Sequence, residues 1–384
     1  MTAGGRNPNP YRGVDWRNVH RVTGCTHMHC VDREQFAEFV SDGLEFATFS
    51  NYYPSAPYYP LASICENTFK RGQKGFVRNG KYADDRIDFN VEIGKWADEL
   101  DPEVRNQLPF PEGKQLFPKL PEGILEAPNA EHHSFADSGI YLHITAPGAR
   151  LASGTFDIHR RFGLEKHGIR PGFPVPWRQA FEAIFASLMI PDGGGIVIAH
   201  PCWSHLPPEF LLELLDSDSR VLGIEVYNHN SEVDFTAFSE SLWDYILGTG
   251  RQCFGFFVKD HPAPDKTWYG KIVLLPEVRT AEACLRVLRQ GRFYGAITGN
   301  GLRFEYLDFD GGVLRAACNR PVAFQLVSKA GVVLDASGTE FRYTLPENEH
   351  ETHVFLRLSA REGRGEEKLY AQPFLLTQSQ RRKK

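Results

Sequence analysis

The hydrophobic pattern alternates between short apolar runs and longer segments with helical spacing. The runs "GIVIA" and "FGFFV" are almost uninterrupted, which is typical of strands buried on both faces. "PPEFLLELLDSD" follows the first run and "FTAFSESLWDYILGTG" follows "LGIEVYN", and both have the spacing of amphipathic helices. "TAEACLRVLRQG" predicts a further helix that ends at Gly291 and leads into a strand. This alternation predicts βαβ units in a parallel sheet or a barrel.

The pattern changes near residue 302. From there on, short alternating strands and Gly, Asp and Asn turns, without a helical period, predict a small all-β, sandwich-like domain. We therefore expect one domain over residues 1–301 and an accessory domain over residues 302–384. The segment 62–125 is rich in proline, glycine, charge and aromatic residues, which indicates an insertion over the mouth of the first domain.

Composition and charge narrow the class of protein. The 384 residues carry a formal net charge of −5, so the chain lacks the basic footprint that nucleic-acid binders use to neutralise phosphates. No apolar run approaches the roughly 20 residues that span a bilayer, and the N-terminus lacks the apolar core of a signal peptide. We expect a cytoplasmic protein that binds neither nucleic acid nor membrane and takes a small-molecule substrate. The pattern indicates no particular oligomeric state.

The stretch "CTHMHC" places two histidines and two cysteines within six positions. The seven cysteines are odd in number and have no repeated spacing, which argues against a disulfide framework and against a structural zinc site. His27 and His29 would project to the same side of an extended chain, where they could share or bridge metal ions. Taken alone, this pair is equally compatible with packed or surface histidines.

Further metal-ligand types recur where apolar runs end. They are Glu131, His143, His200, Asp260 and His261. Because the active sites of α/β barrels gather at the carboxyl ends of the strands, residues far apart in sequence can converge there. A mixed histidine and carboxylate set suits zinc, manganese or iron. The sequence therefore predicts a metal site at one end of the strands.

The order of these motifs resembles the PHP (polymerase and histidinol phosphatase) superfamily of metal-dependent hydrolases over residues 20–300. The shared features are HxH after the first strand, a glutamate followed by a histidine, "AHP" after a hydrophobic strand, and a late aspartate and histidine. The resemblance implies a distorted (β/α)7 barrel that holds two or three divalent ions of zinc, manganese or iron. It also implies a ligand set, with Glu131 as the bridging carboxylate: His27, His29, Glu131, His143, His200, Asp260 and His261.

Two motifs depart from the family pattern. The family has an aspartate and a histidine after the second strand, whereas this chain has Asn51 and Tyr52. The family spaces its last pair as D-x-H, whereas Asp260 and His261 are adjacent and Pro262 occupies the expected position. An amide is uncharged and a phenol is a poor ligand near neutral pH, so one metal position is expected to be weakened or empty.

Several other polar residues have candidate roles around the metals or the substrate. Asn51 and Tyr52 could contribute to a substrate wall, and His132 and His133 follow Glu131 and are expected behind the ligands or at the surface. Glu225 could orient a ligand or pair with a buried cation. Lys259, like Arg160 or Arg161, could bind anionic substrate oxygens.

Three functional hypotheses follow. The leading one is a phosphoesterase in which water activated by the metal ions attacks, with no protein nucleophile. A carboxylic ester, amide or carbamate hydrolase would use the same site, because fold and ligands do not distinguish these substrates. The third is a catalytically inactive binding protein, which Asn51, Tyr52 and the compressed "DHP" motivate.

Overall fold

The computed structural model builds the protein on two β-sheets, one of 11 strands and one of five. It describes residues 8–29, 33–50, 67–68, 77–78, 81–82, 114–115, 121–133, 135, 139–149, 176–262, 269–297, 299, 301–346, 352–363 and 367–376. Two pairs of short strands stand outside the sheets: β3 (Asn67–Thr68) with β6 (Lys114–Gln115), and β4 (Val77–Arg78) with β5 (Lys81–Tyr82). Most of the segment 62–125 lies outside the described residues.

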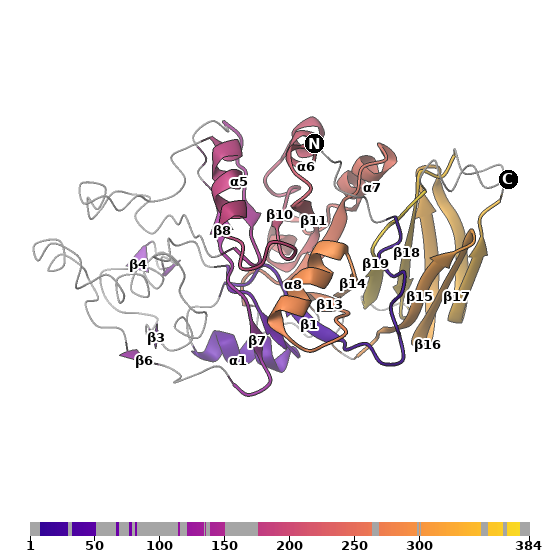
Figure 1. The fold of residues 1–384 in the computed structure, drawn as a ribbon, viewed down its shortest axis with the longest axis horizontal. Coiled ribbons are helices and arrows are strands. Elements are labelled where there is room, and N and C mark those ends of the chain that lie inside the picture. Colours follow the sequence, from indigo (N-terminus) through magenta and orange to yellow (C-terminus); the bar gives the residue numbers. More distant parts are fainter. Residues whose placement is uncertain are drawn as a thin grey trace, which may run out of the picture.

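The large sheet runs in the order β7-β2-β1-β13-β14-β19-β18-β16-β15, with β17 beside β16 and β20 beside β18. Its strands are β1 (Val22–Cys25), β2 (Phe46–Ala47), β7 (Leu125–Glu126), β13 (Gly270–Leu274), β14 (Phe293–Ile297), β15 (Phe304–Asp310), β16 (Val313–Ser328), β17 (Gly331–Thr344), β18 (Phe355–Arg361), β19 (Lys368–Ala371) and β20 (Phe374–Leu375). Only β1, β2 and β7 pair in parallel. Figure 1 shows the C-terminal strands gathered at one end of the molecule.

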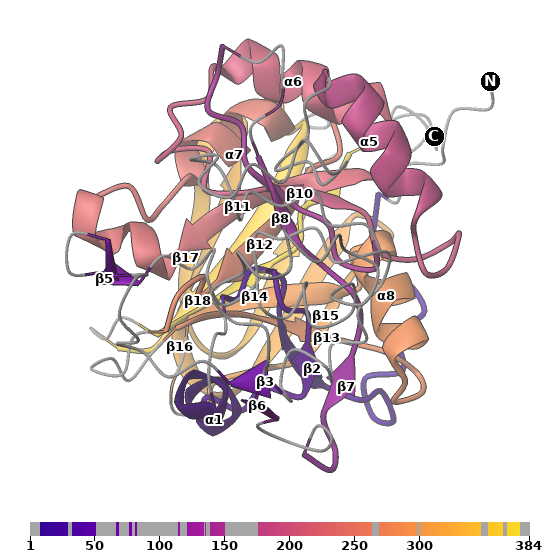
Figure 2. The ribbon, with the colours of Figure 1, turned by 90° about the vertical axis from the view of Figure 1, so that its left-hand side faces the viewer.

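The small sheet runs in the order β12-β11-β10-β9-β8. Its strands are β8 (Glu131–His132), β9 (Ile144–Thr145), β10 (Ile196–Ile198), β11 (Val221–Asn228) and β12 (Phe254–Val258). The last three are parallel and are linked by α6 (Pro208–Ser217) and by α7 (Glu240–Gly248), which follows the 3-10 helix η2 (His229–Asp234). Figures 1 and 2 place α6 and α7 together with α5 (Trp177–Ala186) on one side of this sheet. The strand and helix alternation predicted for this stretch is confirmed.

Local sequence accounts for the bounds of α8 (Ala281–Gln290). The Thr280 side chain accepts a hydrogen bond from the Ala283 N–H at 3.2 Å, which satisfies one of the helix's first donors. Gly291 ends the helix with φ +73°, a left-handed conformation that costs glycine little. The prediction that this helix ends at Gly291 is confirmed.

The remaining helix, α1 (Arg33–Ser41), follows the "CTHMHC" segment. No helix among the described residues has the length and apolar composition required to cross a membrane.

The prediction of a distorted (β/α)7 barrel is wrong. A parallel barrel needs every strand to run in the same direction, but β13 is antiparallel to both of its neighbours, β1 and β14. At the other end of the small sheet, β9 is antiparallel to β10 and to β8. The hydrophobic pattern marks apolar strands correctly, but it carries no information on their direction. An isolated bridge between Met28 and Asp260 is one of the links between the two sheets.

The C-terminal strands also depart from the predicted sandwich. Residues 368–371 of β19 pair with β14, so the strands after residue 302 extend the large sheet. Their apolar core includes residues of the N-terminal segment, among them Tyr11 and Trp16. The Trp16 indole N–H donates to the Leu307 carbonyl at 3.0 Å. A domain boundary at residue 302 stays a prediction.

Candidate metal centre

The HxH segment continues β1 and is held against the end of β12. The Asp260 N–H donates to the His27 carbonyl at 2.9 Å, and the His29 N–H donates to the Asp260 carbonyl at 2.8 Å. His27, His29 and Asp260 are all buried, while Met28 points the other way into an apolar cluster. Asp260 has φ +67°, a left-handed conformation that aspartate tolerates better than most residues. These two hydrogen bonds bring the ends of β1 and β12, from different sheets, together.

Glu131 stands at the centre of the histidines, with 1% of its surface exposed. Its Oε2 lies 3.0 Å from His29 Nε2 and 3.2 Å from His27 Nε2. Its Oε1 lies 2.6 Å from His143 Nδ1 and 3.3 Å from His200 Nε2. One carboxylate therefore faces two pairs of histidines, each through a different oxygen.

The two histidines on the Oε1 side come from neighbouring strand ends. His143 directly precedes β9 and His200 lies two residues after β10. The Ala199 N–H donates to the His143 carbonyl at 3.0 Å, which keeps the two histidines beside each other. His200 has φ +26°, which is unusual for a residue with a side chain.

All seven residues of the predicted ligand set fall into groups of three whose donor atoms lie within 4.8 Å of one another. The groups are His27, His200 and Asp260; His27, His29 and Glu131; His29, Asp260 and His261; and Glu131, His143 and His200. His261 reaches the cluster although it is adjacent to Asp260: its ring stacks on His29 at 4.3 Å between centroids. The missing spacer in "DHP" therefore does not separate this histidine from the others.

The spacing of the donor atoms fits a divalent ion. His27 Nε2 and His29 Nε2 are 3.2 Å apart, and Asp260 Oδ1 is 3.4 Å from each. Ligand atoms about 2.1 Å from a common zinc ion are separated from each other by roughly 3.0–3.4 Å. His143 Nε2 and Asp260 Oδ1 are buried without a hydrogen-bond partner among the described residues. Buried polar atoms are rarely left unpaired, so these two atoms are suited to an ion.

The electrostatics of the cluster keep its carboxylates ionised. Burial favours the neutral form of Glu131, but His27 and His143 outweigh it and hold the pKa of this carboxyl well below its usual range. For His27, burial opposes a charge, yet Asp260, Glu225 and Glu131 raise its pKa well above the ordinary value. Burial lowers the pKa of His143. The cluster therefore combines negative carboxylates with imidazole nitrogens, as a divalent cation requires.

Glu225 orients two of the histidines without joining a group of three itself. Its Oε1 accepts a hydrogen bond from His27 Nδ1 at 2.7 Å, and its Oε2 accepts one from the His200 backbone N–H at 2.8 Å. This contact leaves His27 Nε2 facing Glu131, in the arrangement by which carboxylates orient metal-binding histidines. Of the two roles suggested by the sequence, the geometry supports orientation of a ligand.

Asn228 is a part of this arrangement that the sequence did not reveal. Its side-chain N–H groups donate to Glu225 Oε2 and to Asp260 Oδ2, both at 2.9 Å. Strict alternation along β11 would place residues 225 and 228 on opposite faces. A register shift between Glu225 and Tyr227 brings them to the same face. Such a bulge leaves no reliable signal in one sequence.

The other predicted residues lie in different places. Lys259 is 2% exposed and turns away from the cluster: its ammonium contacts Glu38 of α1 and lies 2.6 Å from Asp42. His133 stacks on His143 at 4.6 Å between ring centroids. His132 is buried, and burial lowers its pKa to about 3, so it is neutral. Asn51, Tyr52, Arg160 and Arg161 lie outside the described residues.

Aromatic side chains border the cluster beside His143 and His200. Trp203 lies 4.9 Å from His200 between ring centroids, and Tyr141 lies 4.4 Å from His143. The Trp203 indole N–H donates to Asp234 Oδ2 at 2.9 Å, which fixes the ring against η2. Tyr141 is 57% exposed. These two rings were missed by the sequence analysis, although "HPCW" and "YLH" place each within three residues of a candidate ligand.

Comparison with known proteins gives little further information. No protein-family model and no curated protein matches the chain. The similar solved structures include the crystal structure of a two-domain protein containing a predicted PHP-like metal-dependent phosphoesterase from Bacteroides vulgatus ATCC 8482. It shares 13% identity, covers 88% of this chain and 90% of its own, and has a TM-score of 0.43. A likeness at that TM-score decides neither fold nor activity, so function rests on the side-chain cluster.

Proposed function

We propose that the protein is a metal-dependent hydrolase that cleaves a phosphoester of a small substrate. The observation that carries this proposal is the shared position of Glu131, whose two oxygens face two separate pairs of buried histidines. This arrangement suits two divalent ions bridged by one carboxylate. His27, His29 and Asp260 would hold one ion, and His143 and His200 would hold the other. A third ion would be held by His261 together with His29 and Asp260.

Ions bound here would supply Lewis acidity toward a phosphoryl oxygen and would make water a stronger acid near neutral pH. The protein's own residues prepare that chemistry. Glu225 accepts a hydrogen bond from His27 Nδ1, so His27 Nε2 is the nitrogen at which an ion would replace a proton. Burial of the cluster excludes bulk water. The His261 side chain is 29% exposed at the edge of the cluster, where it could take or give a proton.

Metal content is the first test. The protein would be purified without chelator and analysed for its elements beside the double variant His27→Ala, His29→Ala, with the exposed His20→Ala as the matched control. We expect two or three ions in the wild type and in the control, and a loss of at least one in the double variant. Less than one ion per wild-type chain would favour a binding protein over an enzyme.

Substrate class is the second test. Metal-loaded wild type would be assayed on a panel of phosphomonoesters and phosphodiesters beside aryl carboxylic esters and amides. Turnover of phosphoesters that the His27→Ala, His29→Ala variant lacks would support the proposal. Turnover of carboxylic substrates alone would replace it with the ester or amide hydrolase, because the same donor set serves both reactions.

A further inference from the structure

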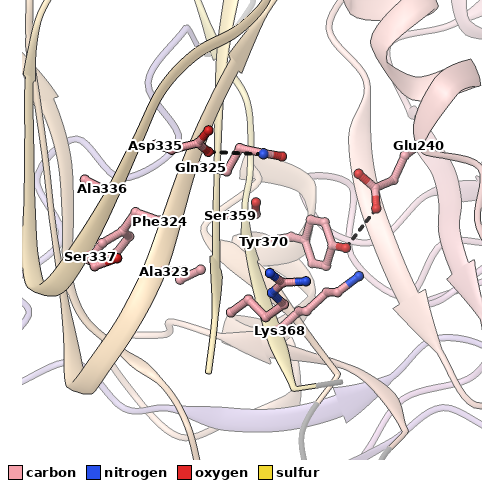
Figure 3. A pocket seen from close by; sticks show the side chains of 12 residues that line it. Glu240, Ala323, Phe324, Gln325, Asp335, Ala336, Ser337, Ser359, Lys368 and Tyr370 are labelled. Carbon is pink, nitrogen blue, oxygen red and sulfur yellow. Dashed lines mark hydrogen bonds between the residues drawn. The ribbon is translucent and has the colours of Figure 1, made fainter. Parts of the chain in front are cut away.

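A hollow lies on the sheet face of the C-terminal strands and shares no residue with the histidine cluster. Its volume is about 620 Å³, within the range of small-molecule sites. Strands β16, β17, β18 and β19 form its floor, and Glu240 at the start of α7 closes one side (Figure 3). The hollow therefore lies where the C-terminal strands meet the small sheet's helices.

Strand register explains the shape of the hollow. Asp335, Gln325, Ser359 and Tyr370 are partners across the four strands and form one row. The next row on the same face consists of Ser337, Ala323, Arg361 and Lys368. Ala323 and Ser359, on the two middle strands, have short side chains that leave space between the longer side chains of Gln325, Arg361 and Tyr370. The alternate residues of these strands point into the apolar core, so the hollow is not a defect of core packing.

Two positive charges stand side by side at this hollow. Arg361 and Lys368 are direct partners on neighbouring antiparallel strands. Like charges in that arrangement repel each other unless an anion lies near. Neither side chain forms an ion pair with any residue in the described part of the chain.

Neither carboxylate that lines the hollow forms an ion pair with Arg361 or Lys368; each contacts other residues. Glu240 accepts a hydrogen bond from Tyr370 Oη at 2.8 Å and lies 3.4 Å from Arg357. Asp335 accepts one from the Gln325 amide at 3.2 Å. Figure 3 shows both contacts at opposite sides of the hollow, with Lys368 below Tyr370.

Another pair of cations on the same sheet shows the contrast. Arg315 and Arg342 are also direct partners, but Asp308 stands opposite Arg315 on β15. That pair lines no part of the hollow. The Arg361 and Lys368 pair therefore differs from the Arg315 and Arg342 pair in two ways: no carboxylate faces it on the neighbouring strands, and it borders the hollow.

We propose that this hollow binds a small anionic polyol, such as a phosphorylated or carboxylated sugar. Arg361 and Lys368 bind the phosphate or carboxylate, for which the planar guanidinium offers two parallel N–H donors. Ser359 and Ser337 offer hydroxyl groups to the polyol, and the free oxygen of Asp335 accepts from its hydroxyls. The site is separate from the histidine cluster and does not depend on the proposed hydrolase activity.

The test is calorimetric titration of the full-length, metal-loaded protein at low ionic strength, where charge is least screened. The probes are glucose 6-phosphate, gluconate, inorganic phosphate and glucose. We expect one of the first two to bind at least about tenfold more tightly than phosphate or glucose. The double variant Arg361→Gln, Lys368→Gln should lose that binding by about tenfold or more. The matched control Arg315→Gln, Arg342→Gln should retain it.

Two further variants distinguish binding in this hollow from binding at the histidine cluster. Ala323→Leu fills the hollow without changing charge and should abolish binding, with circular dichroism as the check on folding. His27→Ala, His29→Ala should bind as the wild type does. The proposal is overturned if the wild type binds neither sugar anion, if both charge-pair variants weaken binding equally, or if only the histidine variant loses it. Equal affinity for inorganic phosphate would overturn the polyol part.

Discussion

At the scale of single residues, Glu225 positions histidines of the cluster through hydrogen bonds on the side away from Glu131. It accepts from the His27 imidazole and from the His200 backbone, so one carboxylate positions two candidate ligands from different strand ends. Replacing it should therefore weaken metal binding without removing a donor atom from the cluster.

We expect Glu225→Gln to lower the affinity for divalent metal by about 10- to 100-fold while the protein stays folded. Glutamine has nearly the same shape, but its amide lacks the charge that holds the proton on His27 Nδ1. Competition with a chromophoric chelator measures the affinity. Glu213→Gln is the matched control, because Glu213 pairs with Arg178 at the surface. Unchanged affinity in Glu225→Gln would show that His27 is positioned by packing alone.

The protonation of His27 predicts how pH affects the metal-free protein. Burial opposes a charge on His27, but Asp260, Glu225 and Glu131 raise its pKa well above the usual value. Stabilisation from this proton is complete below the unfolded pKa of about 6.5 and is lost as pH rises through the folded pKa. Relative to His27→Gln, the wild type's free energy of unfolding in chelator should therefore fall as pH rises.

Urea denaturation of both proteins over a series of pH values measures this difference. Metal affinity should show the opposite trend and increase with pH, because the proton and the ion compete for the same imidazole. A difference between the two proteins that does not vary with pH would contradict the raised pKa.

At the scale of elements, a buried lysine links β12 to α1. The Lys259 ammonium contacts Glu38 and Asp42, and it lies 3.6 Å from the centroid of the Tyr269 ring. Alternation along the strand end places Lys259 and Asp260 on opposite sides, so the same segment supplies a metal-ligand candidate to one face and an ion pair to the other.

We expect Lys259→Met to lower the free energy of unfolding by about 2–3 kcal/mol, because it leaves two partly buried carboxylates without their cation. Metal content should not change. Arg251→Met, which breaks an exposed pair with Asp216, should cost less than about 1 kcal/mol. Chemical denaturation measures both. A normal stability with a raised KM would instead indicate that Lys259 contacts substrate.

At the scale of the whole molecule, the N-terminal segment packs against the large sheet and links its C-terminal strands to β14. Tyr11 Oη donates to the Phe293 carbonyl at 2.9 Å and accepts from the Gln372 N–H at 2.7 Å. This single hydroxyl joins β14 to the residue that follows β19. Pairing of β14 with β19 makes the same connection through the backbone.

We therefore expect one cooperative thermal transition, reported alike by calorimetry and by circular dichroism. Tyr11→Phe should lower the free energy of unfolding by about 1–3 kcal/mol, because a buried donor and acceptor lose their shared partner. Tyr306→Phe, at an exposed hydroxyl, is the control. Two separate transitions would support independent domains on either side of residue 302.

The sequence alone determined the features that depend on near neighbours. Thr280 and Gly291 bound α8 by local capping, and the apolar runs mark β10, β11 and β12. It also determined which residues with possible metal-ligand atoms follow the apolar runs. In the structure, each of the seven predicted ligand residues belongs to at least one group of three with neighbouring donor atoms.

The tertiary structure alone decided what depends on strand direction and on contacts between distant residues. The reversed direction of β13 prevents a closed barrel, and the bulge in β11 brings Asn228 beside Glu225. Lys259 contacts Glu38 of α1 and Asp42, which lie more than 200 positions away in the chain. Only the folded chain brings these residues together. The spacing of apolar residues along the chain indicates which positions are buried. The direction of each strand and its pairing partners are decided only when the whole chain packs.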